Sequence, residues 1–180
     1  MRQRLGWFGS LDGRLSAKLA ILALQPRAAS LRWLRAPATV IAHLGDGILW
    51  ISLGLFSYLL YSAERGRIVS LAAVLLAEAL IVSALKLILR RQRPLHADGR
   101  GFFQGYDRYA FPSGHSARMF CLAVLISATY PGWGWVLWPI AAGVALARVL
   151  LGVHHLADVF VGGVIGALVA WLGWVAFLKG

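Results

Sequence analysis

Long apolar stretches constrain this chain more than any other feature. A helix needs about 20 predominantly apolar residues to cross the hydrocarbon core of a bilayer. Five stretches of the 180-residue chain approach this pattern, over roughly residues 37–61, 68–89, 113–130, 133–151 and 156–178. Backbone polar groups inside a membrane must be satisfied internally, and the chain shows neither barrel alternation nor a fixed repeat. We therefore predict an all-α, polytopic membrane helical bundle with about five transmembrane helices.

The first 36 residues have a different pattern. Arg14–Leu24 is apolar on one side and basic on the other, and Pro26 interrupts it. Amphipathic helices with basic and aromatic residues lie in the membrane interface. We predict an interfacial N-terminal segment over residues 1–36 and one transmembrane domain over residues 37–180; a short sixth span within residues 1–36 is the alternative.

Net charge limits the classes of partner. The chain carries 18 Lys and Arg against 7 Asp and Glu, for a net charge of +11, although 59% of its residues are hydrophobic. In a membrane protein this excess indicates anionic lipid head groups or a phosphorylated substrate. We expect no nucleic-acid partner, because the basic residues flank apolar spans. Cys121 is the only cysteine, which excludes an intrachain disulfide.

Three polar segments are expected at one membrane face. They are "KLILRRQRP" (Lys86–Pro94), "PSGH" (Pro112–His115) and "ARVLLGVHHLAD" (Ala147–Asp158). The second span must end on the face where the third begins, because the loop between them is too short to cross the bilayer. The fourth span then returns to this face and the fifth leaves from it.

The residue types in these segments suit a phosphoryl group. Arg presents a planar fork that matches phosphate, and Lys adds a mobile charge. "PSGH" is typical of a helix start, where free backbone N–H groups can face an anion. His154 and Asp158 are four residues apart and would share a helix face, so the carboxylate can fix the tautomer of an attacking imidazole. His115 can protonate the leaving oxygen. No metal or other cofactor is expected, since few carboxylates lie near the site.

With these spacings the chain resembles the type 2 phosphatidic acid phosphatases (PAP2), the membrane branch of the superfamily that includes vanadium haloperoxidases. That family's pattern is K-x6-RP, PSGH and SR-x5-H-x3-D, and its order and spacing agree with the three segments over about residues 37–178. Ala147 stands where Ser is usual. The resemblance implies a catalytic set and a phosphate-binding set, and it gives His155 no catalytic role. The catalytic set is His154 (nucleophile, through a phosphohistidine), Asp158 (orienting it) and His115 (general acid); the phosphate-binding set is Lys86, Arg93, Ser113, Gly114 and Arg148.

The expected function is metal-independent hydrolysis of a lipid phosphomonoester or diphosphate. Candidate substrates are polyprenyl diphosphates such as undecaprenyl diphosphate, and phospholipid phosphates such as phosphatidic acid or phosphatidylglycerophosphate. Alternatives are a lipid-linked sugar phosphate, a soluble phosphate, or a silent lipid binder or transporter. Membrane lipids are expected partners. "GGVIG" (Gly162–Gly166) favours close packing within the chain, with a homo-oligomer contact as the alternative.

Two opposing signals bear on which side of the membrane the site faces. Fourteen of the 18 basic residues belong to the side of the three polar segments, and the positive-inside rule would place that side in the cytoplasm. The resemblance implies an extracytoplasmic site in the inner membrane for most bacterial members, and we favour that placement.

Five further polar residues have alternative readings. Glu78 is expected to pair with a neighbouring helix, and Arg118 to contact either phosphate or Glu78. His43 and Asp46 are expected to cap a helix or contact a loop rather than take part in catalysis. Arg91 is expected to extend to the membrane interface.

Overall fold

The computed structural model describes residues 8–24, 35–93 and 109–179. Within these ranges the chain is helical and has no strand, which confirms the predicted all-α class. The helices are α1 (Phe8–Leu24), α2 (Arg35–His43), α3 (Gly47–Leu60), α4 (Arg65–Leu89), α5 (Gly114–Thr129), α6 (Gly134–Leu150) and α7 (Leu156–Phe177). Short 3-10 turns precede α4 and α6, at Ser62–Glu64 and Pro131–Trp133.

Three helical segments of the described chain are long and apolar enough to cross a membrane: Ser62–Leu89, Pro131–Leu150 and Leu156–Phe177. A fourth span is formed if α2 and α3 are taken together, although the pair bends by 46° at its break. α5 has only 16 residues. At 1.5 Å per residue it is about 24 Å long, shorter than the hydrocarbon core. The five predicted apolar stretches thus form three full spans, one bent pair and one short helix.

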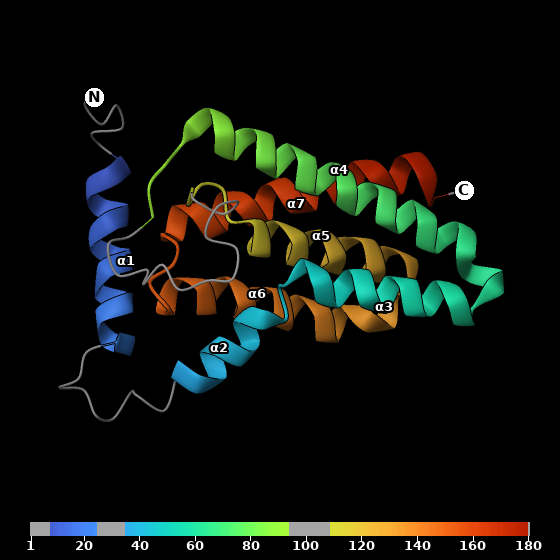
Figure 1. Ribbon diagram of the computed structural model, residues 1–180, viewed down its shortest axis with the longest axis horizontal. Coiled ribbons are helices and arrows are strands. Elements are labelled where there is room, and N and C mark those ends of the chain that lie inside the picture. Colours follow the sequence, from blue (N-terminus) through green and yellow to red (C-terminus); the bar gives the residue numbers. More distant parts are fainter. Residues whose placement is uncertain (1–7, 25–34, 94–108, 180) are drawn as a thin grey trace.

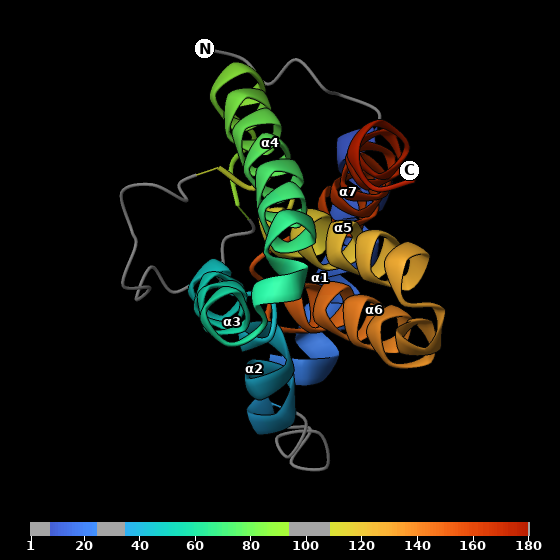
Figure 2. The ribbon, with the colours of Figure 1, turned by 90° about the vertical axis from the view of Figure 1, so that its right-hand side faces the viewer.

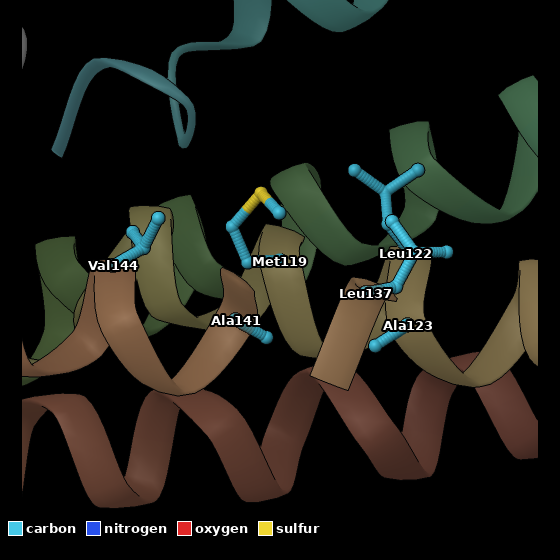
Figure 3. Packing of buried hydrophobic residues seen from close by; sticks show 6 residues of the cluster. All are labelled: Met119, Leu122, Ala123, Leu137, Ala141 and Val144. Atoms are coloured by element: carbon cyan, nitrogen blue, oxygen red, sulfur yellow. The ribbon is translucent and has the colours of Figure 1, made fainter. Parts of the chain in front are cut away.

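The short helix α5 is the centre of the bundle. Seen along the bundle, it lies among α4, α6 and α7 (Figure 2). One face packs against α6 through Met119, Leu122 and Ala123, which meet Leu137 and its neighbours Ala141 and Val144 (Figure 3). A second cluster joins Cys121 and Leu125 to α4 and α7. Because α5 is surrounded by protein, its position is fixed by packing rather than by length.

Small residues let α5 and α7 approach backbone to backbone. A Cβ added to Gly162 would lie 2.5 Å from the carbonyl oxygen of Ser113, and one on Gly166 would collide with the carbonyl of Ala117. The hydroxyl of Ser116 donates to the carbonyl of Val159 at 2.6 Å, across the same contact. The "GGVIG" stretch therefore serves packing within the chain, as predicted.

Helix α1 lies across one end of the bundle, transverse to the long helices α4, α5, α6 and α7 (Figure 1). It contacts α6 and α7. Leu11 and Leu15 are exposed, whereas Ser16 is buried against the bundle. The exposed side of the helix carries the basic residues Arg14 and Lys18 as well as the two leucines, whereas polar Ser16 faces the bundle. The rest of the predicted interfacial segment, residues 1–7 and 25–34, lies outside the described residues.

We expect Gly166→Ala to destabilise the protein. The added methyl group would overlap the backbone of Ala117, and overpacking of this kind costs about 1–3 kcal/mol. Gly54→Ala is the matched control, because nothing lies within 4 Å of its added Cβ. Thermal unfolding in detergent should show a lower midpoint for Gly166→Ala and an unchanged or higher one for the control. Equal midpoints would contradict the packing described.

Candidate active site

Four helix ends lie together at the end of the bundle that α1 crosses. The C-termini of α4 and α6 and the N-termini of α5 and α7 lie at the same end of the bundle (Figure 1). Two backbone hydrogen bonds join them, from Ala110 N–H to the carbonyl of Arg91 at 2.8 Å and from Ser113 N–H to the carbonyl of Asp158 at 2.9 Å. The prediction that the three polar segments share one face is confirmed.

The loop between α6 and α7 folds His154 back onto Arg148. Gly152 has φ 68°, in the left-handed region that glycine adopts without strain. After this reversal, the N–H groups of Val153 and His154 both donate to the carbonyl of Arg148 at 3.2 Å. The arginine and the histidine of the third segment are therefore held together by the main chain.

His154 is buried, and its ring is poorly satisfied. Its Nδ1 lies 3.7 Å from Oδ2 of Asp158, and neither ring nitrogen has a hydrogen-bond partner within the described part of the chain. Burial lowers the pKa of His154 to about 3; Asp158 opposes this shift, while the charges of Arg148 and Arg93 add to it. The imidazole is therefore neutral at neutral pH. With Nδ1 toward the carboxylate, Nε2 carries the lone pair that can attack an electrophile.

Asp158 reaches His154 by a different geometry from the one expected. His154 is not helical: α7 begins at Leu156, and His155 is its N-cap. The expectation that His154 and Asp158 share a helix face is therefore wrong. Asp158 instead turns back over the helix start, where Oδ2 accepts the backbone N–H of His155 at 2.7 Å and lies 3.1 Å from its ring Nδ1. This capping box places the carboxylate beside His154.

Arg91 is a charged partner of Asp158 that the sequence reasoning missed. Its Nη1 donates to Oδ1 of Asp158 at 2.7 Å, and its Nη2 donates to Oδ2 of Asp12 on α1 at 2.6 Å. Only 20% of the Arg91 side chain is exposed. The expectation that it extends to the membrane interface is wrong, because two carboxylates hold it inside the site. The motif "RRQRP" does not reveal this role of Arg91, because both of its carboxylate partners, Asp12 and Asp158, are far away in the sequence.

Helix α1 also completes the start of α7. The first N–H groups of a helix have no partner within the helix. Here the Ser16 hydroxyl accepts the N–H of Leu156 at 2.9 Å, and Oδ1 of Asp12 accepts the N–H of Ala157 at 3.1 Å. The N-terminal helix is thus bonded directly to the element that carries Asp158.

Arg93 and Arg148 lie close enough to the histidines for their charges to act on them, whereas the charge of Lys86 acts on a carboxylate of its own helix. The charges of Arg93 and Arg148 act on His154, and that of Arg148 also acts on His115. Lys86 lies in the last turn of α4, and its charge interacts with that of Glu78, two turns earlier on the same helix. The structure therefore brings Arg93 and Arg148 to the histidines, whereas a phosphate-binding role for Lys86 stays a prediction.

"PSGH" forms the start of α5, as predicted. Ser113 is the N-cap, and its side chain accepts the N–H of Ser116 at 3.5 Å. The expectation that the Ser113 N–H is free for an anion is wrong, because it donates to Asp158. Gly114 and His115 are the first helical residues, so their N–H groups are the ones that lack helical partners.

His115 has a carboxylate partner that the sequence reasoning did not find. Its Nε2 lies 2.8 Å from Oδ1 of Asp46, in the turn between α2 and α3. Asp46 is the N-cap of α3 but makes no side-chain cap bond. Arg118 donates to the carbonyl of Gly45 in the same turn at 2.6 Å, and its charge also faces Glu78, which is buried.

The described residues contain no group of three or more His, Cys, Asp or Glu side chains arranged to hold a metal ion. The polar groups of the site are two histidine–carboxylate pairs, the three arginines Arg91, Arg93 and Arg148, and the N-terminus of α5. Groups of these kinds can bind a tetrahedral anion, and an imidazole can act as a nucleophile or as a proton donor.

Comparison with known proteins points in one direction. The PAP2 superfamily matches residues 67–179. Decaprenylphosphoryl-5-phosphoribose phosphatase of Mycobacterium tuberculosis is 34% identical over 137 residues, which cover 74% of this chain and 75% of that protein. Lipid A 4'-phosphatase of Porphyromonas gingivalis is 29% identical over 116 residues, covering 60% of this chain and 49% of that protein.

Two crystal structures share the fold. LpxE of Aquifex aeolicus superposes with a TM-score of 0.72 at 24% identity, covering 92% of this chain and 96% of that one. The first transmembrane PAP2-type phosphatidylglycerolphosphate phosphatase from Bacillus subtilis superposes with a TM-score of 0.79 at 24% identity, covering 98% and 89%.

We expect Arg91→Gln to destabilise the protein strongly. The change would leave Asp12 and Asp158 without their shared cation, and breaking a buried ion pair costs about 3–5 kcal/mol. Arg90→Gln is the matched control, since exposed Arg90 bonds only a carbonyl of its own helix among the contacts seen. Thermal unfolding should separate the two variants. Similar midpoints would show that the Asp12–Arg91–Asp158 chain contributes little.

Proposed function

The chain belongs to the PAP2 superfamily, and from this premise we propose that it transfers a phosphoryl group from a membrane lipid to His154 and then to water. Its apolar helices and its relatives make it an integral membrane protein. One observation carries the mechanism: a buried, neutral histidine beside a carboxylate, within reach of the charges of Arg93 and Arg148.

In the proposed first step, Nε2 of His154 attacks phosphorus and the bond to the lipid oxygen breaks. Asp158 holds the Nδ1 side of the ring and stabilises the positive charge that develops there. His115 gives a proton to the leaving oxygen. Water then attacks the phosphohistidine and returns His154 to its starting state.

We propose that five groups hold the phosphoryl oxygens. They are the side chains of Lys86, Arg93 and Arg148, the N-cap residue Ser113, and the free N–H of Gly114. Cations and backbone donors aimed at the equatorial oxygens stabilise the charge that spreads over them in the transition state. The charges of Arg93 and Arg148 on His154 support the two arginine assignments.

A lipid substrate is supported by an apolar groove that begins at the site. The groove has a volume of about 790 Å³ and lies between α6 and α7, with Phe120 of α5 at its base. It starts at Leu156, two residues after His154, and continues along α7 as far as Ala167. An acyl or prenyl tail would occupy such a groove while its head group faced His154. Two of the relatives, decaprenylphosphoryl-5-phosphoribose phosphatase and lipid A 4'-phosphatase, are named for lipid-linked phosphates, which supports the same class.

We propose that the site faces the extracytoplasmic side of a bacterial inner membrane. The family resemblance supports this placement, and the basic excess on the same face is then explained by binding to anionic lipid and substrate. A cysteine introduced at Arg90, the exposed C-cap of α4 at this end of the bundle, should react with a membrane-impermeant thiol reagent in intact spheroplasts. Reaction only after lysis would overturn the placement.

The central prediction of this function concerns His154. Purified protein in detergent with EDTA should release phosphate from at least one of phosphatidic acid, phosphatidylglycerophosphate and a polyprenyl diphosphate. His154→Ala should lower kcat by at least about 10³-fold, because the nucleophile is lost. Trp135→Ala is a control, since that side chain is 90% exposed and far along α6 from the loop. Undiminished release by His154→Ala would exclude His154 as the nucleophile.

The groove predicts selective loss of long-chain substrates. Ala142→Trp should fill the groove and lower kcat/KM for a long-chain phosphatidic acid by at least about tenfold, equivalent to about 1.4 kcal/mol of lost binding. A short-chain analogue should be affected much less. Ala73→Trp, at an exposed position of α4, is the matched control. Equal effects on both chain lengths would contradict tail binding between α6 and α7 and favour a soluble phosphate.

A further inference from the structure

The turn between α2 and α3 is built against His115. Asp46 uses both carboxylate oxygens there: Oδ1 lies 2.8 Å from Nε2 of His115, and Oδ2 lies 2.7 Å from Nδ1 of His43. His43 is 69% exposed, whereas only 19% of the His115 side chain is exposed. Asp46 therefore joins a residue of the site to a residue at its outer edge.

Two side chains hold this turn in place through its carbonyl groups. Arg118 of α5 donates to the carbonyl of Gly45 at 2.6 Å, and the indole N–H of Trp50 donates to the carbonyl of Leu44 at 2.7 Å. Arg118 lies on the same helix as His115, three residues later. The helix that carries His115 thus also anchors the turn that carries Asp46.

The turn approaches the His115 ring closely at Gly45. A Cβ added to Gly45 would lie 2.9 Å from Cδ2 of His115 and 3.0 Å from Val144. A side chain at this position would therefore force the turn and the imidazole apart. The contact is long-range, because His115 and Asp46 are 69 residues apart in the chain.

From this geometry we propose that Asp46 is a positioning residue for His115, fixing the tautomer in which Nε2–H faces Asp46 and Nδ1 exchanges protons with the substrate. The inference rests on the proposed function, in which His115 is the general acid. It gives the site two histidine–carboxylate pairs, His154–Asp158 for attack on phosphorus and His115–Asp46 for proton transfer.

The proton balance closes over the two steps. Before the first step His115 is an imidazolium, with protons on both ring nitrogens. The P–N bond to His154 then forms and the P–O bond to the lipid breaks; its electron pair stays on oxygen, which takes the proton from Nδ1 and leaves His115 as the neutral Nε2–H tautomer. In the second, water attacks phosphorus and gives a proton to the same Nδ1 while the P–N bond breaks. Asp46 accepts the Nε2–H bond throughout and stabilises the imidazolium form.

The kinetic test uses Asp46→Asn and two substrates with equal tails. One is an alkyl phosphate, whose leaving alkoxide needs a proton; the other is a nitrophenyl phosphate, whose leaving phenolate does not. We expect kcat for the alkyl phosphate to fall by about 10²-fold, within the range of general acid catalysis, with KM unchanged and with little loss on the aryl phosphate. His115→Asn should show the same pattern, and the double variant should be no slower than His115→Asn alone.

Controls separate positioning from folding. Asn is as good an N-cap as Asp, so Asp46→Asn should keep the start of α3. Glu64→Gln removes a carboxylate outside the site, where it bonds Arg67, and should leave both rates unchanged. Equal loss on the two substrates, or additive losses in the double variant, would overturn the proposal.

A second measurement needs no turnover. At a pH where the His115 ring is neutral, its ¹⁵N shifts should report the Nε2–H tautomer in the wild-type protein and a mixture of tautomers in Asp46→Asn. An unchanged tautomer would overturn the inference. If the tautomer depends on Asp46 but no lipid phosphate is hydrolysed, the proposed function fails while the contact between Asp46 and His115 stands.

Discussion

The hydrogen bond from the N–H of Ser113 to the carbonyl of Asp158 ties the two halves of the site together. It exists because α5 and α7 pack backbone to backbone, which Gly162 and Gly166 allow. The same contact fixes the start of α5 against the start of α7. Since one start carries His115 and the other follows His154, the relative position of the two histidines is determined by helix packing. The site is thus a product of the core and not of a flexible loop.

The cost of burying charged side chains is the second constraint on how this end of the bundle is built. Asp158 is fully buried and would be costly without partners. It is satisfied by Arg91 and by the N-cap of α7, and Arg91 is in turn satisfied by Asp12 of α1. In contrast, the ring of His154 has no hydrogen-bond partner among the described residues. A buried polar group without a hydrogen-bond partner, beside a carboxylate that has several, is available to a ligand or substrate.

The sequence predicted what depends on local pattern and missed what depends on distant contacts. Apolar stretches gave the helical class, and motif order placed four helix ends at one face. The partners of Arg91 and His115 could not be found, because 67 residues separate Arg91 from Asp158 and 69 separate Asp46 from His115. The position of His154 before α7 was also missed, since spacing alone does not distinguish two helical residues from a residue and its cap. Asp46, an acidic residue inside the first apolar stretch, was a signal of a partner elsewhere in the bundle, but the sequence did not identify that partner as His115.

The account as a whole depends on a covalent bond between His154 and phosphorus. The most direct measurement is rapid quenching in base of protein mixed with a substrate labelled in its phosphoryl group, followed by peptide mapping. Phosphohistidine survives base and is lost in acid, so the label should remain on the peptide that contains His154 and His155, and fragmentation should place it on His154. Label on His155, or release of phosphate with no labelled protein at any time, would contradict the mechanism.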